Sequence, residues 1–337
     1  MKKLIAILLI MAMAFALSAC GGGDEPGGTT TPGENNSATT TPSNNDGNSQ
    51  AENNNENNNE NNQPESNDTD TQIEDNAIAS GGGNEEPAEK VEVSLSRQSI
   101  TNERLKEMVE SGEIPANVTH LDLSTNAITD LSPLARLTNL YDLNISNMTE
   151  ELSDISPLSG ITSLGSLNAS TNRINDLSPL ANLTGLTRLR MSRLHTNDLS
   201  PLAGLVNIET LSLSGGGMPR EFEGGFYARE HHLTDITPLA NMVNLRWLSL
   251  ENGRIGDFSV LSNFTQLTWL SLEVCGINDL TPLSNLVHLD TLLLAGEVID
   301  DFYPLFELPV LRAFEVSVVE TPNRESLEEL REIIRNR

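Results

Sequence analysis

Leucines and polar residues alternate in short stretches along most of the chain. In the stretch from Leu186 to Met191, apolar positions alternate with polar ones, which is typical of a short strand with one buried face. A Ser-Pro or Thr-Pro pair stands between successive stretches of this kind, as at Ser178-Pro179 and Thr237-Pro238. The hydroxyl can cap free amides and proline suits the first helical position, so each pair predicts a short helical segment.

This strand-turn-helix unit recurs with a period of 22 residues. Its marker is an aspartate two residues before the helical start, found at Asp130, Asp154, Asp176, Asp198, Asp235, Asp257, Asp279 and Asp301. Two longer steps place insertions near Met148–Glu151 and at 215–229. One unit cannot bury its leucines alone, so stacking is expected to join the units in a parallel sheet over one core.

The repeated phrase resembles a known family. The stretch HLDLSTNAITDLSPLARLTNL, from His120 to Leu140, is similar to the leucine-rich repeats of internalins, which are bacterial surface proteins. The resemblance covers residues 91–320 and implies an α/β leucine-rich repeat solenoid: a curved parallel sheet lines the concave face and short helical or 3-10 segments lie on the convex face. Residues 91–118 include a segment similar to the helical cap of such proteins, and repeats are expected over 119–320.

The ends and one repeat position depart from the family pattern. Residues 321–337 predict a capping helix with Leu327, Leu330 and Ile334 on one face. No immunoglobulin-like module or cell-wall sorting signal is expected after the repeats. The family's asparagine position holds Asn126 and Asn172, but other residues elsewhere: Met148, Leu194, Gly216, Gly253, Cys275 and Glu297. Cys275 is interpreted as a buried substitute for asparagine rather than a reactive or metal-binding thiol.

Residues 1–20 read as an export signal because two lysines precede an unbroken apolar run. The ending Leu17-Ser18-Ala19-Cys20 resembles a bacterial lipobox, which implies a lipid on Cys20. A plain signal peptide or a membrane helix is the alternative. Anchoring is expected on the outer face of the cytoplasmic membrane of a Gram-positive cell, or at the outer membrane if the cell has two membranes.

Residues 21–90 are rich in Asn, Gly, Thr and Glu, a composition that cannot bury enough apolar surface to fold. They predict a disordered spacer with a span on the order of 45 Å. The net charge of −28 argues against a nucleic-acid partner, because phosphate recognition needs basic clusters. A monomer without cofactor or metal is expected. The eight aspartates are interpreted as acceptors in Asx turns rather than as calcium ligands.

The strand positions that point away from the core are mostly small and polar, with one exception. RWLSLE is followed one repeat later by TWLSLE, which places Trp247 beside Trp269 and Glu251 beside Glu273, about 4.8 Å apart. Tryptophan is enriched at binding hot spots. The alternative is that these rings only pack on each other or lie under the inserted loop.

Two further groups of residues join this candidate surface. Arg188 and Arg190 form a basic spot that either pairs with a partner's acids or with Asp142 or Glu209 of the chain itself. Phe222, Phe226 and Tyr227 of the insertion either cover the tryptophans or extend their patch.

Three functions are compatible with the sequence. A lipid-anchored adhesin or receptor-like module that binds a protein on its concave face is favoured, since repeats create extended binding surfaces. A glycan-binding module that uses Trp247 and Trp269, and a purely structural surface protein, are the alternatives. No catalytic site is expected: Glu251 and Glu273 resemble a glycosidase pair, but an open sheet offers no pocket to raise the pKa of one carboxyl.

Overall fold

The computed structural model describes residues 82–215, 221–222, 225–226, 233–317 and 324–337. All of them belong to one compact unit, Glu74–Arg337. The export signal, Cys20, the spacer as far as residue 81 and Tyr227 of the insertion lie outside the described residues.

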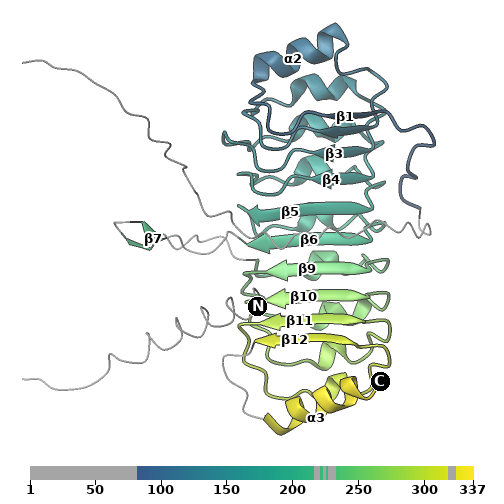
Figure 1. The fold of residues 1–337 in the computed structure, drawn as a ribbon, viewed down its shortest axis with the longest axis vertical. Helices are drawn as coiled ribbons and strands as arrows, with labels where there is room; N and C mark the ends of the chain where they lie inside the picture. Colours follow the sequence, from purple (N-terminus) through teal and green to yellow (C-terminus); the bar gives the residue numbers. More distant parts are fainter. Residues whose placement is uncertain (1–81, 216–220, 223–224, 227–232, 318–323) are drawn as a thin grey trace, which may run out of the picture. The chain divides into compact units, whose positions relative to one another are not determined.

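A ten-stranded parallel sheet forms the unit, with its strands stacked in chain order between helices α2 and α3 (Figure 1). Its strands are β1 (Glu92–Ser94), β2 (His120–Asp122), β3 (Asp142–Asn144), β4 (Ser166–Asn168), β5 (Arg188–Leu194), β6 (Thr210–Gly215), β9 (Trp247–Glu251), β10 (Trp269–Glu273), β11 (Thr291–Ala295) and β12 (Ala313–Ser317). Strands β7 (Glu221–Phe222) and β8 (Gly225–Phe226) pair antiparallel with each other as a separate sheet.

Short 3-10 helices alternate with the strands, as the repeat pattern predicts. They are η1 (Ser132–Arg136), η2 (Ser156–Gly160), η3 (Ser178–Leu180), η4 (Ser200–Leu202), η5 (Thr237–Leu239), η6 (Ser259–Asn263), η7 (Thr281–Leu283) and η8 (Tyr303–Leu305). In neighbouring strands equivalent leucines are in register, such as Leu121 with Leu143 and Leu143 with Leu167, and all three are buried. The leucine-rich repeat solenoid is therefore confirmed.

All eight repeat aspartates accept a backbone hydrogen bond from the residue two positions ahead. The Asp176 carboxylate, for example, accepts from the N–H of Ser178 at 2.8 Å. The equivalent bonds occur at Asp130, Asp154, Asp198, Asp235, Asp257, Asp279 and Asp301. The expected Asx turns are confirmed.

One detail of the helix starts differs from the sequence prediction. The Ser or Thr hydroxyl of Ser178 or Thr237 does not cap its 3-10 helix; the residue is itself the first helical position, with proline next to it. The preceding aspartate accepts the first free N–H instead. A carboxylate two residues upstream is placed to reach that amide, and the short 3-10 turn leaves the hydroxyl no amide to cap.

Both ends of the core are covered by helices. Helix α2 (Asn102–Ser111) packs against η1, with Leu105 and Met108 buried, and ends at Gly112, whose φ of 79° suits glycine. Helix α3 (Arg324–Arg335) packs against η8 and buries Leu327 and Leu330, while Ile334 is partly buried, as predicted. None of the helices in the described part of the chain is long and apolar enough to cross a bilayer.

Two features at the N-terminal end go beyond the sequence prediction. Strand β1 pairs with β2, so the sheet begins one strand before the first repeat. Residues 82–90, placed in the spacer on composition, run beside the repeats: Asn84 donates its side-chain amide to the carbonyls of Thr162 and Leu164, at 2.8 and 3.0 Å. The backbone N–H of Asn84 donates to the carbonyl of Gly185. These contacts begin seven residues before Val91, where composition places the end of the spacer.

Candidate functional site

The strand face of the solenoid consists of the outward-pointing side chains of the ten-stranded sheet. On β2, β3 and β4 one polar side chain of each strand bonds back to the chain. Asp122 accepts from the N–H of Ser124 at 2.8 Å, and Asn144 and Asn168 accept from Ser146 and Ser170 in the same way at 3.1 Å. One polar side chain on each of these three strands is thereby held by the chain itself.

Two stacked tryptophans interrupt the polar strand face at β9 and β10. Trp247 and Trp269 are in direct register, and their rings are 4.3 Å apart and 8° from parallel. The sequence prediction of two neighbouring rings is confirmed. Both side chains are only half-buried, and such a stack contributes about 0.5–1.5 kcal/mol beyond its buried area. Large half-exposed aromatic rings of this kind are suited to contact with a partner.

The next outward positions are two buried serines. Ser249 and Ser271 are register partners, 3% and 1% exposed. The Ser249 hydroxyl donates to the Glu251 carboxylate at 2.9 Å. The Ser271 Oγ, in contrast, is buried and has no hydrogen-bond partner among the described residues. A buried polar atom without a partner costs free energy.

Glu251 and Glu273 complete the same two strands, as predicted, and are also in register. Burial raises the pKa of the Glu273 carboxyl, and the nearby carboxylates of Glu251 and Glu315 raise it further. In the described part of the chain nothing donates a hydrogen bond to the Glu273 side chain or pairs with it. No group of three or more potential metal-ligating side chains occurs in that part either.

The two arginines lie on β5, which is separated from β9 by β6. Arg188 is close enough to Glu209 and Tyr141 for its charge to lower the pKa of both groups, although burial raises both pKa values overall. Arg246 acts on Glu209 more strongly than Arg188 does. Pairing of Arg188 with Glu209 therefore has support, while a role for Arg188 and Arg190 in partner binding stays a prediction.

Inside the repeats, the asparagine positions form a ladder of buried polar contacts. Asn126 accepts from the N–H groups of Gln98 and Ile100 and donates to the carbonyls of Leu95 and Leu123. Asn172 makes the equivalent bonds between its own repeat and the preceding one.

In the C-terminal repeats the equivalent buried hydrogen bonds are made by two residues, Cys275 and Glu297. The Cys275 Sγ donates to the carbonyl of Leu250 at 2.9 Å, and the buried Glu297 accepts from the N–H groups of Cys275 and Gly276. Burial raises the pKa of the Cys275 thiol to about 12, so the thiol stays neutral, as its structural interpretation requires.

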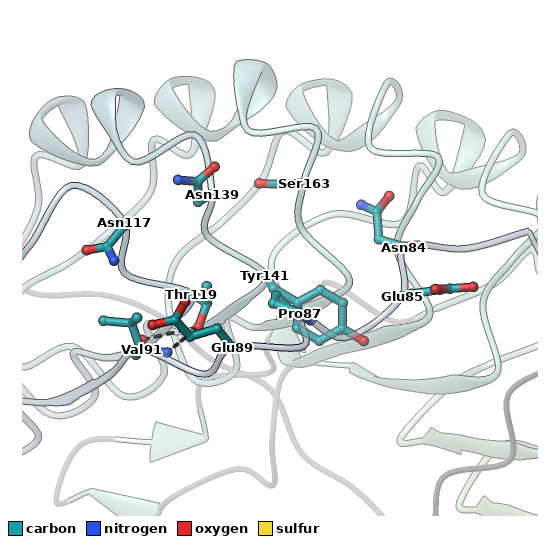
Figure 2. Close-up of a pocket in the computed structure, with 10 residues that line it drawn as sticks. All are labelled: Asn84, Glu85, Pro87, Glu89, Val91, Asn117, Thr119, Asn139, Tyr141 and Ser163. Atoms are coloured by element: carbon teal, nitrogen blue, oxygen red, sulfur yellow. Dashed lines mark hydrogen bonds between the residues drawn. The ribbon is translucent and has the colours of Figure 1, made fainter.

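A separate hollow lies on the flank where the first strands begin, beneath residues 82–90. Figure 2 shows its lining, which is mostly amides, hydroxyls and apolar groups: Asn84, Glu85, Pro87, Glu89, Val91, Asn117, Thr119, Asn139, Tyr141 and Ser163. Val91 and Thr119 are tied together across it by two hydrogen bonds. The lining residues form no nucleophile-base pair, and the strand face at β9 and β10 is the stronger candidate site.

The insertion and the serines show what sequence reasoning could and could not find. For Phe222 and Phe226 the structure describes only the backbone of β7 and β8, so coverage or extension of the tryptophan patch stays a prediction. Ser249 and Ser271 were visible as the middle residue of each WLSLE motif. Their burial and their different bonding could not be read from two identical motifs.

Comparisons with known proteins agree with the geometry. Residues 116–160 match the family model for two copies of leucine-rich repeats. No curated protein matches the chain. Among solved structures, an internalin of Listeria monocytogenes is 30% identical with a TM-score of 0.51, and the match covers 60% of this chain and 80% of that protein.

Two further structures extend the comparison. A second internalin of Listeria monocytogenes is 27% identical with a TM-score of 0.50, covering 63% of this chain and 69% of that one. A leucine-rich repeat protein of Leptospira interrogans has a TM-score of 0.55 at 17% identity, covering 69% of this chain and 61% of that one; at this identity it supports the fold alone.

Proposed function

This chain belongs to the internalin-like leucine-rich repeat proteins, and we propose that it is a binding module of the bacterial surface whose strand face recognises a protein partner. The observation that carries the proposal is the half-buried stack of Trp247 on Trp269. The two rings are large and aromatic on an otherwise small and polar face, and tryptophan is enriched at binding hot spots.

A glycan ligand is the second candidate, because tryptophan beside carboxylate also suits a sugar. The stack argues against it as the first choice: each ring has one face against the other ring, so the pair offers less open ring surface than separated tryptophans would. A protein partner can instead contact the ring edges together with the flanking strands β6 and β11.

Membrane anchoring through a lipid on Cys20 is part of the proposal and rests on the sequence motif. Residues 82–90 would then join the tether to the flank of the repeats. Expression of the full-length chain with radiolabelled fatty acid should label it and retain it on membranes. Cys20→Ser should abolish both the label and the retention. A Cys20→Ser chain that stays on membranes would contradict lipid anchoring.

Capture experiments test the strand face directly. The full-length chain is immobilised and exposed to a fractionated surface-protein extract and, separately, to a glycan panel. For a captured protein, Trp247→Ala/Trp269→Ala should weaken binding about 30-fold, since a hot spot contributes about 2 kcal/mol. The matched control is Tyr303→Ala, which removes an exposed aromatic ring at the start of η8; it should bind like the wild-type chain.

Each alternative outcome has a definite meaning. Sugar capture that depends on both tryptophans would replace the protein partner with a glycan. Unchanged capture by the double variant, with its circular dichroism intact, would remove the site from the tryptophans and refute the proposal.

A further inference from the structure

We infer that the site at β9 and β10 recognises an arginine side chain of the partner protein, with the guanidinium bound by the Glu273 carboxylate and the Ser271 hydroxyl beside the tryptophan stack. This inference rests on the proposed function and names the chemistry that the strand face selects. Three observations on β10 and its neighbours carry it.

The first observation is the unsatisfied hydroxyl. Ser271 is 1% exposed, and its Oγ has no partner among the described residues, whereas Ser249 in register on β9 donates to Glu251. Both serines stand on the strand face between a tryptophan and a glutamate. Solvent reaches the Ser271 hydroxyl poorly at such low exposure. A ligand group that inserts beside it would supply the missing hydrogen bond.

The second observation is the uncompensated charge. Glu273 is partly buried and carries no hydrogen bond or ion pair in the described part of the chain, and Glu251 and Glu315 add negative charge around it. Neighbouring β11 contributes only Thr291, Leu293 and Ala295 to this face, so no cation there compensates the carboxylates. Complementarity requires a positive ligand, and the donor set is too small for a metal ion.

The third observation is the order of groups along β10. Trp269, Ser271 and Glu273 occupy alternate positions of one strand and therefore point to the same side. A guanidinium has five donors in a planar fork, so it can bind a carboxylate and donate to a hydroxyl at once. The arginine side chain also packs its guanidinium plane and its aliphatic stem well against an indole ring. The compact ammonium of lysine packs there less well.

The chain contains its own reporter for this site. Its only two tryptophans are Trp247 and Trp269, so intrinsic tryptophan emission arises from the stack alone. The full-length chain is titrated with an acetylated and amidated Gly-Arg-Gly tripeptide, and with the same tripeptide carrying citrulline or lysine. The arginine peptide should give a saturable change in emission, with half-saturation in the millimolar range expected of one anchoring side chain.

Substitutions then separate binding from stability. Citrulline in the peptide, or Glu273→Gln in the protein, should weaken binding about tenfold, because the charge-assisted hydrogen bonds are lost. Asp142→Asn removes a carboxylate from the same face at β3 and should leave binding unchanged. Ser271→Ala should weaken binding without lowering the unfolding temperature, whereas Ser249→Ala should lower it, because only Ser249 has a bond to lose.

The outcomes distinguish this inference from the proposed function. An absent response to the arginine peptide, an equal response to citrulline, or unchanged binding by a folded Glu273→Gln variant would each overturn the arginine inference. The strand face would still be a protein-binding site if capture of a protein partner depended on the two tryptophans. Tryptophan-independent capture would instead refute the proposed function itself.

Discussion

The first repeats and the last ones share a backbone but treat their polar groups differently. In β2–β4 the strand-face residues Asp122, Asn144 and Asn168 bond to the chain itself, and Asn126 and Asn172 make buried polar contacts inside. In the repeats of β9–β11 Cys275 and Glu297 make the buried contacts instead, and among the described residues the Ser271 hydroxyl and the Glu273 carboxylate on the strand face have no partner. The comparison teaches that one backbone repeat can satisfy its polar groups in different ways, and the proposed binding site lies in the repeats that do so least completely.

The largest effect is expected at the asparagine ladder. Asn126→Ala would leave at least three buried backbone groups without partners, and the free energy of unfolding should fall by about 4 kcal/mol. Urea unfolding followed by circular dichroism measures it. Asn263→Ala, at an exposed position with a single long side-chain bond to the carbonyl of Ala240, is the matched control and should cost little. Equal losses for the two variants would contradict the ladder's role.

A middle-sized effect is expected at Glu297. Glu297→Ala would leave the N–H groups of Cys275 and Gly276 buried without an acceptor, at a cost of about 2 kcal/mol. Glu297→Gln keeps an acceptor and removes the charge.

The same residue gives a pH dependence with a defined sign. Burial raises the folded-state pKa of Glu297, so its contribution to stability is fully present below its ordinary pKa and is lost as pH rises through the raised pKa. Glu297→Gln should therefore lose less stability between pH 4 and pH 7 than the wild-type chain does. Glu307→Gln removes one exposed charge and should keep the wild-type profile. Identical profiles for Glu297→Gln and wild type would show that the buried carboxyl does not titrate in this range.

The smallest effect on stability is expected at the Asx turns, which the N-terminal and C-terminal repeats share. Asp130→Ala and Asp279→Ala each remove one Asx turn, and each should lower Tm by about 2–4 °C. For Asp279 the hydrogen bonds from the Thr281 hydroxyl and N–H lower the pKa, so its contribution is present above its ordinary pKa and is lost as pH falls. Differential scanning calorimetry at pH 7 and pH 3 should show this direction, which is opposite to that of Glu297. Markedly unequal Tm shifts at pH 7 would mean that the repeats are not equivalent at this position.

Most of the repeat architecture could be predicted from the sequence because it depends on local periodicity. The period of 22 residues, the position of Pro179 at a helix start and the Asx turn at Asp176 each depend on a few neighbouring residues. The N-terminal end of the solenoid was less predictable from the sequence. Strand β1 has only three residues, too few for a clear alternating pattern, and it is a strand because it pairs with β2. Asn84 is held by carbonyls 78 and 80 residues away in the sequence.

The candidate site shows the same division. The aligned WLSLE motifs place Trp247 against Trp269 and Glu251 against Glu273, because parallel strands with a fixed period must pair in register. The sequence by itself determined which residues share the strand face and which fill the core. Only the tertiary structure decided that Ser249 has a partner, whereas Ser271 and Glu273 have none among the described residues. Those outcomes depend on side-chain orientation and on the charges of Glu251 on β9 and Glu315 on β12, which no single repeat encodes.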